Sequence, residues 1–180
     1  MNDQGSEYQR LIAPIENRMI RVVWRIVRDP NDADDALQEA LLTIWKRWRQ
    51  VRKHPNPQAL VLRICIHSAY DMMRQKARRL KWQETDSIAS AIPDNAASMT
   101  QKLSDHQQGE QVLEAIGRLP KNQAQAILMR AVEEIPYCDI ALAMNCREAT
   151  VRKHVARART RLRTLLSHLF PAVQKEDAHA

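Results

Sequence analysis

Residues 149–163, ATVRKHVARARTRLR, constrain the fold of the chain more than any other segment. Their apolar side chains recur at helical spacing, as Val151, Val155, Ala158 and Leu162. The six Lys and Arg residues of the segment lie outside this stripe, and no acidic residue interrupts them. The pattern predicts an α-helix with a narrow buried stripe and a broad cationic face. Solvated helix faces usually mix charges, so a face of one sign favours a polyanionic partner.

Composition favours an all-α chain that works in the cytoplasm. The 180 residues include only three Gly and one Phe, whereas sheet proteins usually contain more of both. A net charge of +7 is typical of proteins that bind nucleic acid. No apolar run approaches the roughly 20 residues of a membrane span, and the polar N-terminus lacks the apolar core of a signal peptide. We therefore expect no membrane insertion, and free thiols at Cys65, Cys138 and Cys146.

Helical spacing and helix-breaking residues divide the chain into two groups of helices. The first group is predicted over residues 7–28, from an N-cap at Asn31 or Asp32 to residue 51, and over residues 58–82. The second group is predicted over residues 111–118, 122–132, 137–144 and 148–168. Polar residues without a long apolar period separate the groups. We expect an all-α fold of two small helical domains, residues 1–82 and 109–170, with a flexible linker at 83–108 and a tail at 171–180.

Two of these helices form a helix-turn-helix pattern. Residues 137–144 place Ile140, Ala141 and Met144 on one face, and Asn145 begins a turn in which a left-handed backbone is expected. In this motif the N-terminal end of the second helix enters the major groove of DNA. The residues expected to reach base edges are Arg147, Glu148, Thr150, Arg152, Lys153 and His154, whereas Arg157, Arg159 and Arg161 are expected to contact phosphates. A helical hairpin with a solvated basic face is the structural alternative.

The segment from Leu119 to Arg163, LPKNQAQAILMRAVEEIPYCDIALAMNCREATVRKHVARARTRLR, resembles region four of bacterial sigma factors of the extracytoplasmic-function (ECF) group. The resemblance lies in Leu119-Pro120, in Tyr137 with Asp139-Ile140-Ala141, in Thr150-Val151-Arg152 and in residues 156–159. It implies binding to the −35 promoter element through the second helix of the motif. The turn has Asn145 where the family commonly has Gly.

Residues 32–45, DADDALQEALLTIW, resemble the DAEDLVQE-type motif of sigma region two. Helical spacing places Asp34, Asp35, Gln38 and Glu39 on one face of the second helix. Helix capping and the helix dipole account for acidic residues at the start of this helix, but not for Gln38 and Glu39. The resemblance implies that this face docks on the clamp helices of the largest subunit of core RNA polymerase. A plain solvated helix start is the alternative.

The third predicted helix, ALVLRICIHSAYDMMRQKARRLKW, resembles the part of region two that opens the −10 promoter element. An unpaired base must be held once it leaves the stack, because flipping costs a few kcal/mol. The resemblance and this requirement together give a predicted −10 DNA-binding set of His54, Asn56, Arg63, His67, Asp71, Arg74, Arg78 and Arg79. The family usually has Asn in place of His67 and Trp in place of Leu60.

The leading hypothesis is therefore a sigma factor whose partners are core RNA polymerase, promoter DNA and an anti-sigma factor, the last from the resemblance alone. No paired nucleophile and base, no metal-ligand spacing and no glycine-rich phosphate loop occurs in the sequence, so neither catalysis nor a cofactor is expected. A stand-alone, dimeric DNA-binding regulator is a second hypothesis. A DNA-rearranging enzyme such as a resolvase is a third, although its catalytic domain would require strands that the sequence does not predict.

Overall fold

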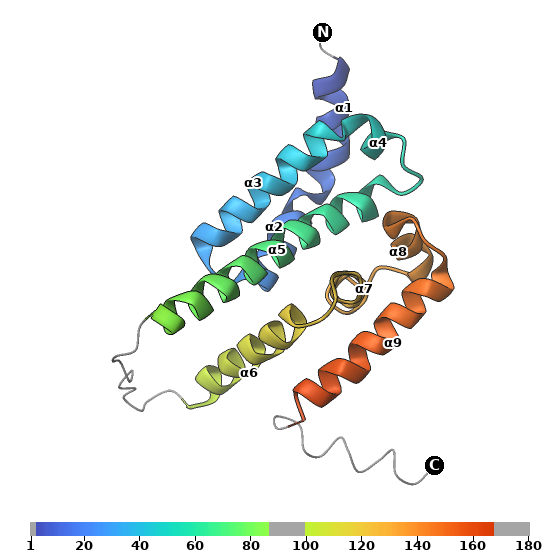
Figure 1. Ribbon diagram of the computed structural model, residues 1–180. Helices are drawn as coiled ribbons and strands as arrows, with labels where there is room; N and C mark the ends of the chain where they lie inside the picture. The colour runs from blue at the N-terminus through green and yellow to red at the C-terminus, as the bar shows by residue number, and fades with distance from the viewer. Residues whose placement is uncertain (1–2, 87–99, 168–180) are drawn as a thin grey trace.

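Figure 1 shows the computed structural model of the chain, which describes residues 3–86 and 100–167. All secondary structure in these two ranges is helical, which confirms the predicted fold class. In chain order the elements are α1 (Asp3–Ile12), the 3-10 helix η1 (Ala13–Ile15), α2 (Glu16–Val27), α3 (Pro30–Lys46), α4 (Trp48–Arg52), α5 (Pro57–Asp86), α6 (Thr100–Gly117), α7 (Lys121–Ala131), α8 (Tyr137–Met144) and α9 (Glu148–Leu165). Within the described ranges, no helix is long and apolar enough to cross a membrane.

In the first half of the chain, α2 and α3 pack along α5 (Figure 1). The buried residues of α3 are Ala33, Ala36, Ala40 and Ile44. Helical spacing predicts a stripe of Leu37, Leu41, Ile44 and Trp48 for this segment. Only Ile44 belongs to the buried set of α3, because Leu37 and Leu41 are partly exposed and Trp48 lies in α4. The distance between two packed helix axes depends on the size of the side chains between them. Alanines at the contact therefore let α3 lie close to its neighbours.

Two long predicted helices are each interrupted. The helix predicted over residues 7–28 is divided into α1, η1 and α2, with Pro14 inside η1. Proline lacks a backbone N–H and its ring clashes with the carbonyl four residues earlier, so the first helix cannot continue through it. The second predicted helix breaks at Arg47, whose φ of −103° and ψ of 18° are not helical.

The N-cap of α3 is Asp29, not Asn31 or Asp32 as predicted. The side chain of Asp29 accepts a hydrogen bond from the backbone N of Asp32 at 3.1 Å, and Pro30 occupies the first helical position, which suits a residue without an N–H. Lys76 of α5 contacts both carboxylates, with Nζ 3.1 Å from Asp29 and 2.7 Å from Asp32. These hydrogen bonds from Asp32 and Lys76 lower the pKa of Asp29. The cap thereby joins the start of α3 to α5.

The tryptophans divide between core and surface. Their apolar neighbours on predicted helices favour core packing for Trp24, Trp45 and Trp48. Trp48 is 3% exposed, in agreement with this expectation, but Trp24 and Trp45 are 40% and 51% exposed, so the expectation is wrong for these two. Trp45 instead lies edge-on to Tyr8, with ring centroids 5.6 Å apart. An exposed tryptophan leaves a large apolar surface in water, so the outer faces of α2 and α3 carry apolar area available for contacts.

The predicted linker at 83–108 is helical at both of its described ends. Helix α5 continues to Asp86, and α6 begins at Thr100 rather than near residue 111 as predicted. Residues 87–99, the centre of the predicted linker, and the predicted tail at 171–180 lie outside the described residues. The described helices therefore extend on both sides beyond the groups predicted from apolar spacing.

In the second half, α8 and α9 form the predicted helix-turn-helix. Asn145 ends α8 with a left-handed φ of 51°, and the next residue, Cys146, donates its backbone N–H to Ala141 O at 3.0 Å. This geometry closes the turn without glycine, because asparagine tolerates the left-handed region. Helix α9 buries Val151, Val155 and Ala158 against α7 and α8, as its apolar spacing predicts. The turn and the buried stripe together fix the cationic face of α9 toward the outside.

Helix α7 of the second half lies between α5 and α9 (Figure 1). It contacts α9 on one side and α5 on the other, and seven consecutive residues, Gln123 to Met129, are buried. A helix that is covered all round in this way belongs to the core. The buried residues of both halves form one continuous apolar cluster.

The cysteines are free thiols in different environments. Cys65 is fully buried in α5, and burial raises the pKa of its thiol to about 12. Cys138 is exposed and Cys146 is half-buried. Within the described residues, no cluster of His, Cys, Asp or Glu has the arrangement of a metal site.

Candidate nucleic-acid and partner interfaces

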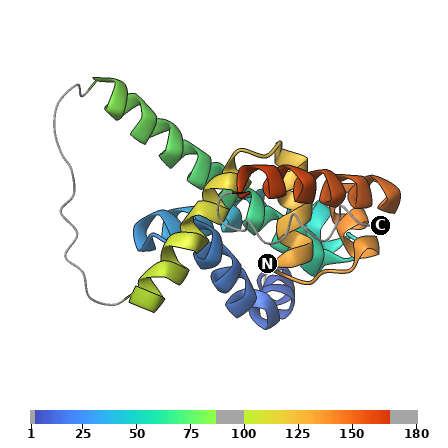
Figure 2. The same ribbon diagram turned by 90° about the horizontal axis from the view of Figure 1, so that it is seen from below.

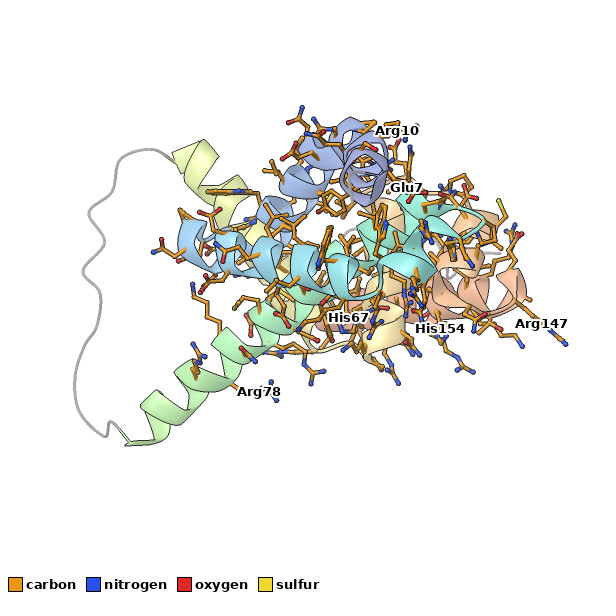
Figure 3. The ribbon with its side chains drawn as sticks, turned by 90° about the horizontal axis from the view of Figure 1, so that it is seen from above. Glu7, Arg10, His67, Arg78, Arg147 and His154 are labelled. Carbon is orange, nitrogen blue, oxygen red and sulfur yellow. The ribbon has the colours of Figure 1, made fainter. Side chains whose placement is uncertain are left out.

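The cationic face of α9 is exposed along its length. Arg147, Arg152, Lys153, Arg157 and Arg159 are all exposed. The three other predicted base-reading residues are half-buried: Glu148, Thr150 and His154. Figure 3 shows Arg147 at the outer end of the helix-turn-helix, pointing away from the chain. The sequence-predicted set therefore forms one accessible surface that begins at the turn and continues down α9.

Arg152 is held in place by two neighbours within this surface. Its guanidinium lies over the ring of Tyr137, 4.4 Å from the centroid, and donates two hydrogen bonds to Glu148 Oε1. Arg130 contacts the same ring at 5.2 Å. The quadrupole of an aromatic ring attracts a guanidinium at such a distance, so the ring attracts both. Tyr137 belongs to the family pattern, but its contact with Arg152 does not follow from the sequence.

The predicted polymerase-docking residues lie together on the outer face of α3. Asp34, Asp35, Gln38 and Glu39 are all exposed. Leu42 and Trp45, 59% and 51% exposed, continue the same stripe by one and two further turns. The face is therefore acidic at its N-terminal end and apolar at its C-terminal end. The apolar end was missed because Trp45 was predicted to lie in the core, although its spacing from Gln38 and Leu42 places it on the outer stripe.

The predicted −10 residues separate into two groups along α5. Arg74, Arg78 and Arg79 are exposed on the C-terminal part of the helix, which projects beyond the other helices (Figure 2). Figure 3 shows Arg78 on this projection. Arg63, His67 and Asp71 lie earlier in the helix, where α5 faces α7. The structure thus brings the first group to the surface and the second group against the other half of the chain.

The second group forms a continuous series of contacts with α7, hereafter the α5–α7 seam. Arg63 Nε donates to Gln125 Oε1 at 3.3 Å, and Gln125 Nε2 lies 2.7 Å from His67 Nδ1. His67 Nε2 lies 3.1 Å from Asp71 Oδ2, which also accepts from Lys121 Nζ at 3.0 Å. Burial lowers the pKa of His67, whereas the nearby Asp71 carboxylate opposes that shift. His67 is therefore favoured in its neutral form.

The loop before α5 is tied to both halves. Asn56 caps α5, because its Oδ1 accepts from the backbone N of Ala59 at 3.0 Å. The ring nitrogens of His54 lie 2.8 Å from Asn56 O and 3.2 Å from Leu142 O, the latter in α8. The two loop residues predicted to contact a flipped base are thus engaged with backbone groups in this conformation.

Comparison with known proteins matches both halves of the chain to one family. Residues 11–79 match the family model of sigma-70 region 2, and residues 109–162 match that of sigma-70 region 4, together more than half of the chain. The ECF RNA polymerase sigma factor SigM of Mycobacterium tuberculosis is 28% identical over 168 residues, which cover 92% of this chain and 80% of SigM. A Xanthomonas campestris protein named "Probable RNA polymerase sigma factor RfaY" is 24% identical over 172 residues, covering 95% of this chain and 43% of that protein.

A solved structure supports the fold. The sigma factor RpoE in complex with the anti-sigma factor NepR from Bartonella quintana has a TM-score of 0.51 and 22% identity, covering 93% of this chain and 98% of that one. Two regions of one family occur here in the order and at the separation that the sequence motifs indicated. The chain belongs to the ECF sigma factors, the subunits that bind core RNA polymerase and direct it to promoters.

Proposed function

We propose that α3 docks on core RNA polymerase while α9 and α5 bind the −35 and −10 elements of the promoter. The separation of charge over the surface carries this proposal. Acidic residues gather on the outer face of α3, whereas exposed arginines gather on α9 and on the projecting part of α5. A polyanion would be repelled by the first surface and attracted by the other two. Nucleotide addition belongs to the polymerase, so the chain has no catalytic step of its own. Because bacterial RNA polymerase acts in the cytoplasm, we place the chain there as well.

The two halves of the chain then have separate tasks. Residues 1–82 bind polymerase and the −10 element, and residues 109–170 bind the −35 element. Arg74, Arg78 and Arg79 suit the phosphate backbone, because they are exposed cations on a projecting helix. We assign the flipped base to Arg63, His67 and Asp71, together with the loop at His54 and Asn56. In this structure these α5 residues and His54 contact the second half of the chain. Asn56 would act mainly by shaping this loop, since its side chain caps α5.

Reading of the −35 element centres on the first turns of α9. Arg152 is the best placed to contact a guanine, because a guanidinium bonds both acceptors of that base in the major groove. Its contacts with Glu148 and Tyr137 restrict its rotamers before DNA arrives. A side chain that is already ordered loses less entropy on binding. We therefore assign Tyr137 a positioning role in base recognition, acting through Arg152.

Replacing Tyr137 by Leu should weaken binding to the selected −35 duplex by about two- to five-fold, which corresponds to about 0.5–1 kcal/mol for a cation–π contact at an exposed site. Tyr137→Phe keeps the ring and should bind like the wild type. The measurement is fluorescence anisotropy on the selected duplex and on a scrambled duplex. A positioning role predicts that only the specific affinity falls. Equal loss on both duplexes, or equal loss in the Phe variant, would contradict it.

We also propose an anti-sigma factor as a protein partner. The family resemblance motivates this proposal, and the sigma factor RpoE from Bartonella quintana, which is similar in fold, was solved in complex with the anti-sigma factor NepR. The exposed apolar side chains of Trp24, Leu42 and Trp45 are surface that a protein partner could cover. Pull-down with the tagged chain from its own bacterium, followed by an initiation assay with the recovered protein, tests this partner.

Size-exclusion chromatography with bacterial core RNA polymerase tests the proposed function as a whole. We expect a stable one-to-one complex that initiates from a promoter which core polymerase alone does not use. The stand-alone regulator predicts instead a dimer that binds a palindromic duplex and ignores polymerase. A monomer that fails to bind polymerase from its own source organism would overturn the polymerase-docking role of α3.

A further inference from the structure

The junction between α3 and α4 carries a group of cations that belongs to none of the proposed interfaces. Residues 46–54, KRWRQVRKH, contain five Lys and Arg residues, and no acidic residue occurs between Glu39 and Asp71. All five cations are exposed. Exposed surfaces of soluble proteins usually mix the two signs of charge. A surface of one sign at this junction therefore needs a reason beyond solubility.

The local structure turns these cations outward. Arg47 leaves the helical region between α3 and α4, with a φ of −103° and a ψ of 18°. In α4, Trp48 and Val51 are three residues apart and face the core, where they are 3% and 0% exposed. The neighbouring positions at Arg49 and Lys53 therefore lie on the outside. Figure 1 shows α4 at one end of α5, whereas the projecting C-terminal part of α5 is at the other.

Most of these cations have no counterion among the residues that the structure describes. Arg52 is the exception, because its Nη1 lies 3.1 Å from Glu7 Oε2 of α1. The side chains of the other four form neither a hydrogen bond nor an ion pair with any described residue, and we call them the α3–α4 corner: Lys46, Arg47, Arg49 and Lys53. The dipole of α3 favours a cation such as Lys46 at its C-terminal end. It does not account for the other three.

The corner adjoins the residues to which we assign the flipped base. Lys53 is followed directly by His54, whose backbone N–H bonds to a carbonyl of α4 at 3.1 Å. On the side of α5, burial lowers the pKa of Arg63 and of His67, and the positive charge of Arg47 lowers both further. Arg47 therefore lies near both side chains. The corner is next to the proposed base-binding residues in sequence and in space.

An unpaired DNA strand is the polyanion that fits this position. Like charges gathered without a counterion attract an anion. Cations spread over a corner suit a chain of phosphates better than one compact anion, and proteins that bind single strands use a positively charged surface that follows the backbone. A flipped base has a phosphate on each side, so its strand continues in both directions. The exposed arginines of α5 lie on one of these sides: Arg74, Arg78 and Arg79.

We propose that the α3–α4 corner binds phosphates of the unpaired −10 strand on the side of the flipped base opposite to the projecting part of α5. This inference rests on the proposed −10 role of α5 and of the loop at His54. Pro57 and Arg79 lie about 33 Å apart along α5, at about 1.5 Å per residue. At about 3.4 Å per nucleotide, a strand that reaches from the corner to the projection contains about ten nucleotides.

The double variant Lys46→Ala with Arg49→Ala tests the corner in the full chain. Both side chains are exposed and unpaired, so their loss should leave the fold intact. The measurement is fluorescence anisotropy with a labelled, mixed-sequence single-stranded 20-mer over a series of salt concentrations. Loss of two phosphate contacts should lower affinity about ten-fold at about 0.15 M salt and reduce the salt slope by about 1.4. Lys46→Gln with Arg49→Gln, which keeps long side chains without charge, should show the same loss.

The matched control is Arg10→Ala with Arg21→Ala, which removes two exposed cations from α1 and α2. Figure 3 shows Arg10 well away from His67. The control should bind the strand like the wild type. Equal loss in the control and the corner variant would indicate a general charge effect and overturn the proposed site. A corner variant that kept its affinity for the strand but bound core polymerase more weakly would assign the corner to a protein partner, which also overturns it.

The variant Arg78→Ala with Arg79→Ala separates this inference from the −10 role of α5. Loss of affinity in this variant and in the corner variant supports one strand that contacts both groups. Loss in the α5 variant alone overturns the corner and leaves the −10 role of α5 standing. Loss in the corner variant alone supports the corner and contradicts the role of the projecting part of α5. Wild-type affinity in both variants overturns both.

Discussion

Reversing two charges on α3, in the double variant Asp35→Lys and Glu39→Lys, is expected to raise the Kd for core polymerase by at least about 100-fold, or about 2.8 kcal/mol. Like charges placed opposite each other across an interface cost several kcal/mol, and two reversals act together here. Both side chains are exposed and lie beyond the first turn of α3, so the free energy of unfolding should change by less than about 0.5 kcal/mol. Fluorescence anisotropy with core polymerase at fixed salt measures the effect.

Helix α6 supplies a control with the same charge change. Glu110 and Glu114 are exposed and are also spaced by four residues, so Glu110→Lys with Glu114→Lys alters the net charge equally. The pair between Glu114 and Arg118 is exposed and contributes little to stability. We expect this control to bind polymerase like the wild type at 0.15 M salt. Equal weakening of both variants would indicate a general charge effect and contradict a specific docking face on α3.

The local features of the fold were within reach of the sequence because they depend on nearby residues. The buried stripe of α9 follows from its apolar spacing, and the left-handed turn follows from the tolerance of Asn145. Pro14 also carried a local signal for the break between α1 and α2 that the prediction did not use. The N-cap at Asp29 is of the same kind, since an aspartate followed by proline is a favoured helix start.

The pairing of the two halves was beyond such reasoning. Helical spacing shows that Arg63, His67 and Asp71 share a region of α5, but not which element covers them. Gln125 is 58 residues away from His67 in sequence, and nothing in the local pattern links the two. The uncharged run at residues 122–129 was the one available signal, because it indicated a helix without a solvent face. The sequence therefore identifies the candidate DNA-binding residues by type, but not their partners across the α5–α7 seam.

Removing the two cations that follow the first turn of α9, in Arg152→Ala and Lys153→Ala, is expected to abolish selective binding to the −35 element. A good bidentate base contact is worth about 1–3 kcal/mol, or about 5- to 150-fold in affinity. Arg152 should account for most of the loss, because Glu148 and Tyr137 order its guanidinium, whereas Lys153 is an exposed point charge. The duplex is one selected by the wild-type chain from a random library, and a scrambled duplex measures nonspecific affinity.

Arg157→Ala and Arg159→Ala give the contrasting behaviour on the same helix. These exposed residues lie farther from the turn and suit phosphates, so each should lower affinity for both duplexes alike and reduce the salt slope by about 1. The ratio of specific to nonspecific affinity thus separates the two roles independently of overall binding strength. Arg152→Ala should reduce this ratio, and Arg157→Ala should leave it unchanged. If Arg152→Ala lowered both affinities equally, Arg152 would contact phosphate, and base recognition would move to Arg147 or Thr150, nearer the turn.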